Sequence, residues 1–220
     1  MKALIFDLDG TLIDSVYPHA LAWQQTLNEA ALPVPAWELQ RHIGISGKLL
    51  VRTVARARAH RFDAQTIERL EARHDEIFRG YQALQQPLPG AIELLRFVVE
   101  HHIAHGIATT GRRSEVEGSL RKLGIGAETI VIDGDSGSPK PEPDLFVVCQ
   151  ERLGVARADC LVVGDSVWDI HSARRAGILA VGVLTGGFGE QELYNAGAMR
   201  VYRDAAQMLA GIDELGLQID

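Results

Sequence analysis

The stretch that decides the fold is Phe6-Asp7-Leu8-Asp9-Gly10-Thr11-Leu12. Residues 2–6 lead into it as a mainly apolar run with the length and composition of a buried β-strand. Such a strand would bring Asp7 and Asp9 to its carboxyl end, which is where ligands bind in open α/β sheets. Two carboxylates held this close repel each other unless a cation shares them. The stretch therefore predicts a site for Mg²⁺, which prefers oxygen ligands.

The same residues match two other patterns in part, a hairpin turn and an EF-hand loop. Asp9-Gly10 is also a common hairpin turn signal, and these residues alone leave that interpretation open. An EF-hand loop also opens with two alternating acids, but it needs glycine and glutamate where Leu12 and Pro18 stand. An EF-hand is thereby excluded.

Composition narrows the class of protein. The chain has 220 residues, enough for one large domain or a core with a smaller insertion. Its hydrophobic content of 46% and charged content of 23% are those of an ordinary globular protein. A formal net charge of −7 argues against nucleic acid as a partner, since phosphate backbones require a basic face. No feature of the sequence implies a protein partner.

The expected location is the cytoplasm. The apolar run before Asp7 is too short for a signal peptide or a membrane span, so no membrane association is expected. Cys149 and Cys160 show neither metal-ligand spacing nor a disulfide framework, and they are expected to be buried thiols in a reducing compartment.

The pattern of apolar residues divides the chain. Residues 15–84 show helical periodicity only, whereas strands and helices alternate from residue 85 onward. Alternation of this kind predicts an α/β fold, a Rossmann-like parallel sheet covered by helices on both faces. We therefore expect an α/β core of residues 1–14 and 85–220, with an all-α domain, residues 15–84, inserted after the first strand.

Further polar groups fall at the carboxyl ends of predicted strands. Thr109, Thr110 and Gly111 follow one strand and precede a helix, an arrangement that could bind phosphate oxygens or merely cap the helix. Lys140 lies in a loop stiffened by prolines, where it could meet an anion or simply be solvated.

A second acid pair follows a later strand. Asp165 and Asp169 are four residues apart, so one helical turn can aim both at one point, although an aspartate at a helix start is often only a cap. All these groups fall at one edge of the predicted sheet, in an order that combines a cation site with an anion site. That agreement favours a functional site over unrelated turns and caps.

With these residues in this order, the chain resembles the haloacid dehalogenase-like hydrolase superfamily, which has four sequence motifs. It is most similar to the branch with a helical cap between the first two of them. Asp7-x-Asp9-Gly-Thr matches the first motif, Thr109 the second and Lys140 in K-P-x-P the third. Gly164-Asp165-x-x-x-Asp169 matches the fourth, and the motifs occur in the right order over nearly the whole chain. Thr110 stands where the family more often has asparagine or serine.

The resemblance implies a Mg²⁺-dependent phosphatase that acts on a small phosphate ester. Asp7 would be the nucleophile that forms an aspartyl-phosphate, and Asp9 the general acid and then the general base. Lys140 and Thr109 would stabilise the transferring phosphoryl group, with Thr110 and Gly111 beside it. The metal ligands implied are Asp7, the backbone carbonyl of Asp9, Asp165 and, through water, Asp169.

Two departures within the family bear on the reaction. Asp9 favours phosphate esters, because members that cleave carbon–halogen bonds lack the second acid. Gly164 stands where β-phosphoglucomutase-type members tend to have an acid, which makes the chain more similar to phosphoglycolate phosphatase and its relatives. The second interpretation, after the phosphatase, is a phosphomutase that forms the same aspartyl-phosphate. The remaining alternative is a non-catalytic protein that binds a phosphorylated ligand.

The basic run of residues 41–61 is the candidate for substrate choice in the cap. Such runs are usually solvated helix faces. Arg41 and Lys48 flank the loop from Gly44 to Gly47, so one or both are expected to meet an anionic group at the far end of the substrate.

Overall fold

The computed structural model describes residues 1–126 and 129–218. It confirms the α/β fold, with six parallel strands in the order β3-β2-β1-β4-β5-β6. The strands are β1 (Ala3–Phe6), β2 (Ala104–Ala108), β3 (Ile130–Ile132), β4 (Cys160–Gly164), β5 (Leu179–Val183) and β6 (Arg200–Tyr202). The order reverses direction at β1, which lies between β2 and β4. The carboxyl end of β1 is thus the switch point at which ligands bind in such sheets.

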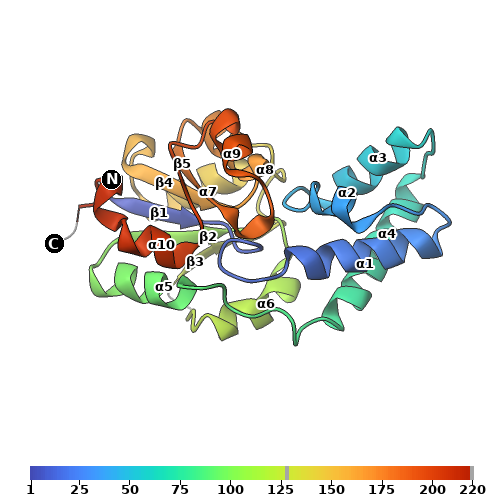
Figure 1. The fold of residues 1–220 in the computed structure, drawn as a ribbon, viewed down its shortest axis with the longest axis horizontal. Coiled ribbons are helices and arrows are strands. Elements are labelled where there is room, and N and C mark those ends of the chain that lie inside the picture. The colour runs from blue at the N-terminus through green and yellow to red at the C-terminus, as the bar shows by residue number, and fades with distance from the viewer. Residues whose placement is uncertain (127–128, 219–220) are drawn as a thin grey trace.

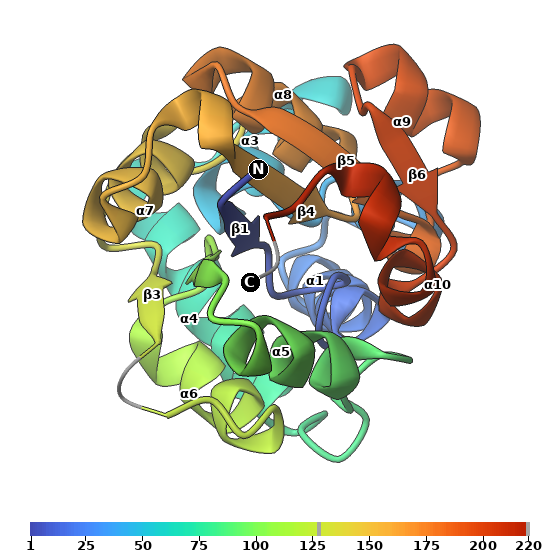
Figure 2. The same ribbon diagram turned by 90° about the vertical axis from the view of Figure 1, so that its left-hand side faces the viewer.

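Helices cover both faces of the sheet, as alternation of strands and helices predicts (Figures 1 and 2). One face carries α7 (Asp144–Leu153), α8 (Val167–Ala176) and α9 (Glu190–Ala196). The other carries α5 (Ala91–Glu100), α6 (Arg113–Lys122) and α10 (Ala205–Ala210).

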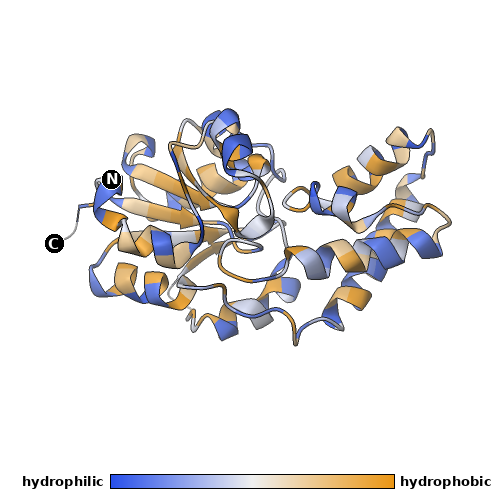
Figure 3. Ribbon diagram, in the orientation of Figure 1, coloured by the Kyte–Doolittle hydropathy of each residue, from blue (hydrophilic) through white to orange (hydrophobic). Residues whose placement is uncertain are grey.

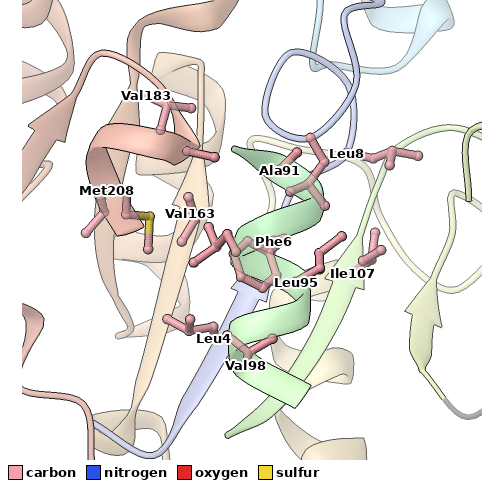
Figure 4. Packing of buried hydrophobic residues seen from close by; sticks show 14 of the residues in the cluster. Leu4, Phe6, Leu8, Ala91, Leu95, Val98, Ile107, Val163, Val183 and Met208 are labelled. Atoms are coloured by element: carbon pink, nitrogen blue, oxygen red, sulfur yellow. The ribbon is translucent and has the colours of Figure 1, made fainter. Parts of the chain in front are cut away.

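Strand β1 is buried on both faces, which explains its continuous apolar sequence. Its side chains alternate, so that Leu4 and Phe6 pack into the core under α5 and α10, while Ala3 and Ile5 pack into the core under α7 and α8. Figure 4 shows Phe6 at the centre of the first of these cores, beside Leu95 and Ile107. In Figure 3 the central strands β1 and β4 are accordingly among the most hydrophobic parts of the chain.

Between β1 and α5 the chain forms four helices that lie to one side of the sheet (Figure 1). They are α1 (Val16–Glu29), α2 (Ala36–Gln40), α3 (Gly47–Ala57) and α4 (Ala64–Arg79). They share a core of their own, in which Trp23, Leu50 and Leu70 are buried. Asp63 caps α4, because its side chain accepts a hydrogen bond of 2.7 Å from the Thr66 amide.

The expected boundaries at residues 14/15 and 84/85 stay a prediction. Residues 127–128 and 219–220, which fall within the expected core, lie outside the described part of the chain. Across that described part, no helix is both long and apolar enough to cross a membrane.

Candidate active site

The loops that follow β1, β2, β3 and β4 bring the predicted site residues to one edge of the sheet. Parallel strands end on the same side, so residues more than a hundred positions apart become neighbours. Asp7 and Asp9 come from the first loop, Thr109 from the second, Lys140 from the third and Asp165 from the fourth.

Three carboxylates form a buried cluster there. Asp7, Asp165 and Asp169 each have an oxygen within 4.8 Å of an oxygen of the others. Two glycines leave the space that Asp165 occupies: a Cβ atom would come within 2.5 Å of its carboxylate at Gly10 and within 1.7 Å at Gly186. Gly10 also has a φ of +86°, which side-chain-bearing residues rarely adopt.

Lys140 is the cation of this cluster. Its side chain is fully buried, its Nζ donates a hydrogen bond to Asp7 Oδ1, and it lies 2.7 Å from Asp169 Oδ1. Burial alone would lower the pKa of Lys140, but the carboxylates of Asp169 and Asp7 raise it above its ordinary value. The lysine is therefore held as a cation by its neighbours.

One ammonium does not balance three carboxylates. Burial, with repulsion from the neighbouring carboxylates, raises the pKa of Asp7 to about 7 and that of Asp165 well above its ordinary value. Asp169 Oδ1 also accepts no well-directed hydrogen bond from any residue that the structure describes, despite its proximity to Lys140. A divalent cation would balance the excess negative charge and would also bind the free oxygen of Asp169. This acidic cluster therefore has the character of a metal site.

The two oxygens of Asp169 have separate contacts. Oδ2 accepts hydrogen bonds from the backbone amide and the hydroxyl of Ser166, at 3.0 and 2.6 Å, and thereby caps α8. Oδ1 faces Lys140. The helix-cap interpretation and the site interpretation of Asp169 are thus compatible, because a carboxylate has two oxygens to use.

The Asp9 carboxylate is not part of this cluster. Its Oδ1 accepts a 2.6 Å hydrogen bond from the Ser15 hydroxyl, and its Oδ2 lies 3.4 Å from the Thr109 hydroxyl. Burial would raise the pKa of Asp9, but contacts with His19 and Ser15 lower it below its ordinary value. Asp9 is accordingly held ionised by these two neighbours.

Two histidines that the sequence analysis did not single out form a chain of contacts that begins at Asp9. His19 Nε2 lies 3.5 Å from Asp9 Oδ1, and His19 Nδ1 lies 3.1 Å from His74 Nε2. The His74 ring is held in turn by Asp75 Oδ1 at 2.9 Å. His74 falls in the apolar stripe of α4 with Leu70 and Phe78, which is why its sequence position indicates only packing. A polar residue inside such a stripe was the one signal available.

A cavity of about 330 Å³ opens between these loops and helices α1, α3, α4 and α6. Asp7 and Asp9 line it, and so do Thr110, Gly111 and Lys48. The buried Lys140, Asp165 and Asp169 are not among its lining residues, although Lys140 contacts Asp7, which is.

The structure places Arg41 elsewhere. Its guanidinium forms an ion pair with Glu192 and lies 4.0 Å from the centre of the Phe188 ring, outside the cavity. Trp168 donates a 3.0 Å hydrogen bond to the Arg41 carbonyl. Arg41 thus joins the helical insertion to the α/β part of the chain, and of the two expected residues only Lys48 lines the cavity.

Comparison with known proteins agrees with this arrangement. Residues 4–183 match the family of haloacid dehalogenase-like hydrolases. The chain belongs to this family. It is 31% identical to a phosphoglycolate phosphatase of Rhodospirillum rubrum over 94% of this chain and 89% of that protein. It is also 31% identical to a β-phosphoglucomutase of Bacillus subtilis, over 83% of each chain.

A solved structure extends the likeness to the whole fold. A hydrolase from Pseudomonas syringae is 36% identical and superposes with a TM-score of 0.93, covering 98% of this chain and 99% of that one. This haloacid dehalogenase-like hydrolase is therefore an enzyme of the phosphatase and phosphomutase kind, and its relatives differ in what they act on.

Proposed function

We propose that this hydrolase is a Mg²⁺-dependent phosphatase that hydrolyses small phosphate monoesters, of the phosphoglycolate or sugar phosphate type, through an aspartyl-phosphate. One observation carries the proposal. Of the two acids at the sheet edge that line the cavity, Asp7 is the one whose carboxylate accepts a hydrogen bond from the buried Lys140. A carboxylate that is fixed, buried and open to a substrate on one side is suited to be a nucleophile.

Asp7, Asp165, Asp169 and the backbone carbonyl of Asp9 are the proposed ligands of the ion. Their hard oxygens and the uncompensated charge of the cluster suit Mg²⁺. When bound, Mg²⁺ would offset negative charge on the phosphoryl oxygens in the transition state.

In the first step Asp7 attacks phosphorus, and the bond from phosphorus to the ester oxygen breaks. Asp9 gives a proton to the departing alkoxide. Lys140 keeps Asp7 oriented, and the Thr109 hydroxyl stands between Asp9 and the Gly111 amide, which donates to it at 3.1 Å. Because charge spreads over the phosphoryl oxygens, these donors and the start of α6 favour the transition state.

In the second step water attacks phosphorus and releases Asp7. Asp9 takes the proton of this water, and its lowered pKa keeps it ionised, as this step requires, in the state described here. For the first step Asp9 must carry a proton, so substrate binding is expected to weaken its contacts with His19 and Ser15.

The helical insertion, residues 15–84, is proposed as the cap that excludes water and reads the substrate. It supplies Lys48, Glu71 and His74 to the cavity, whereas the α/β part supplies the reacting groups. Phosphatases that share one reaction but act on different substrates need this separation of substrate recognition from the reacting groups.

The test is Asp7→Asn, which keeps the shape of the side chain but removes the nucleophile. Phosphate release from p-nitrophenyl phosphate with Mg²⁺ should fall to background, while the variant keeps a cooperative thermal transition. Near-normal turnover by the folded variant would refute the role of Asp7.

A phosphomutase is the second candidate, supported by the β-phosphoglucomutase relative. Gly164 favours the phosphatase, because β-phosphoglucomutase-type members of the family tend to have an acid at this place. In this chain a Cβ atom there would come within 2.4 Å of the Asp169 Cβ, so an acidic side chain does not fit without a shift. We expect one phosphate per ester consumed and no need for a bisphosphate. Isomerisation of a sugar phosphate without phosphate release, accelerated by a bisphosphate, would favour the mutase instead.

A further inference from the structure

The part of the cavity that lies beyond the reacting aspartates has an unusual charge for an enzyme of phosphorylated acids. Three carboxylates line it: Glu71 and Asp75 on α4, and Glu115 at the start of α6. Asp135 adds a fourth from the loop after β3. The cationic side chains of the wall are Lys48 and Arg112.

The acids of this wall outnumber its cations. Arg112 Nη1 lies 3.7 Å from Asp75 Oδ2 and is thereby already paired, which leaves Lys48 as the remaining cation. Burial raises the pKa of Glu71, an effect that the charge of Lys48 opposes, and burial together with Asp75 raises the pKa of Glu115 to about 7. Above that pH the acids carry more negative charge than the two cations offset, so they repel a negatively charged group at this end of the cavity over several ångströms.

Glu71 also has an unmet hydrogen-bonding capacity. Its Oε2 is buried and accepts no hydrogen bond from any described residue. A buried acceptor without a donor is costly, and a ligand that supplies an N–H or O–H would satisfy it. The neighbouring Glu115 differs, because its Oε2 already accepts a 3.0 Å hydrogen bond from the Arg112 amide.

We propose that this wall selects phosphate esters whose far end donates hydrogen bonds, as hydroxyl or ammonium groups do, and rejects esters that end in a carboxylate. The inference rests on the proposed phosphatase function and names its substrate class. Polyol, sugar and amino-alcohol phosphates belong to the accepted class, and phosphoglycolate belongs to the rejected one. The buried faces of Trp23 and Leu50 in the same cavity suit the carbon chain of such a ligand.

Matched pairs of esters test this selection. Glycerol 3-phosphate and 3-phosphoglycerate differ only in a terminal hydroxymethyl against a carboxylate. Phosphoethanolamine and phosphoglycolate differ in an aminomethyl against a carboxylate. With Mg²⁺ present, kcat/KM should be at least about tenfold higher for the first member of each pair. Equal values, or a preference for the acids, would overturn the inference.

Two substitutions in the wall are expected to change the ratio of kcat/KM within each pair of esters in opposite directions. Glu71→Gln removes one negative charge and should narrow the ratio within each pair about three- to tenfold, mainly through KM of the acid. Lys48→Gln removes a positive charge and should widen the ratio. Glu68→Gln is the matched control: it lies one turn earlier on α4, is exposed and does not line the cavity, so the ratio should not move. If all three substitutions changed the kcat/KM ratio alike, the selection could not be attributed to the charges of this wall.

The outcomes separate the two proposals. Absence of phosphate release from every ester, p-nitrophenyl phosphate included, would count against the phosphatase function itself. Release from p-nitrophenyl phosphate combined with a preference for the carboxylate esters would leave that function standing and refute only the substrate class. If Glu71→Gln does not fold, as judged by loss of its thermal transition, Glu71→Ala replaces it. The same narrowing of the kcat/KM ratio is expected for Glu71→Ala.

Discussion

His19 Nδ1 lies 3.1 Å from His74 Nε2, which joins helix α1 to helix α4 directly behind Asp9. The two rings are nearly parallel, and the aromatic rings of Trp23 and Phe78 stack on the pair. An imidazole this enclosed loses the water that would solvate its charged form. Burial consequently lowers the pKa of His74 to about 4.

The first prediction concerns the pH dependence of stability. An unfolded histidine takes up a proton near pH 6.5, whereas folded His74 resists until about pH 4, so the unfolded state binds more protons between these values. Stability from this group is therefore full above pH 7 and falls as the pH is lowered. The loss should reach about 2 kcal/mol by pH 5.

Denaturant unfolding of His74→Gln, measured at pH 7.5 and pH 5, checks this. The variant should lose less stability than the wild type between the two values, whatever its stability at pH 7.5. His60→Gln serves as control, because His60 is exposed. An equal pH dependence of the wild type and His74→Gln would contradict the burial argument.

The second prediction concerns Lys140. Lys140→Met removes the only ammonium in contact with Asp7 and Asp169 among the described residues. Buried carboxylates without a partner cost about 3–5 kcal/mol, and the cost should be larger at pH 8 than at pH 6, because protonation relieves it. Thermal unfolding in chelator measures the effect. Lys2→Met, which breaks an exposed ion pair with Asp159, should change stability by about 1 kcal/mol or less.

Metal binding gives the third prediction. Mg²⁺ should raise the Tm of the wild type, because it binds the folded state, and a 100-fold excess over Kd corresponds to about 2.7 kcal/mol. Asp165→Asn should lose this gain but match or exceed the wild type in chelator. The reason is that burial disfavours the charged Asp165, while an amide can still accept the 3.0 Å hydrogen bond from Thr11. A normal Mg²⁺ response of the variant would exclude Asp165 as a ligand.

The fourth prediction separates Arg41 from Lys48. Because Arg41 pairs with Glu192 outside the cavity, Arg41→Gln should change kcat/KM for all esters by a similar factor, and Glu192→Gln should have the same effect. A change in the ranking of substrates by Arg41→Gln, absent in Glu192→Gln, would instead indicate direct contact with the substrate.

Local sequence determined the fold class and the positions of the acids. The run before Asp7 is apolar at every position because β1 is buried on both faces, and the same reason makes β4 recognisable before Asp165. Since parallel strands end at one edge, the sequence also placed Asp7, Thr109, Lys140 and Asp165 in one region. Their catalytic roles stay predictions.

Tertiary structure alone decided which side chains touch. Lys140 meets Asp169, Arg41 meets Glu192, and His19 meets His74, across separations of 29, 151 and 55 positions. Hydrophobic periodicity reports whether a residue faces a core, but not which distant residue faces it there. His74 illustrates the limit: its place in an apolar stripe is visible in the sequence, while its polar partners come from another helix and depend on how the two helices pack.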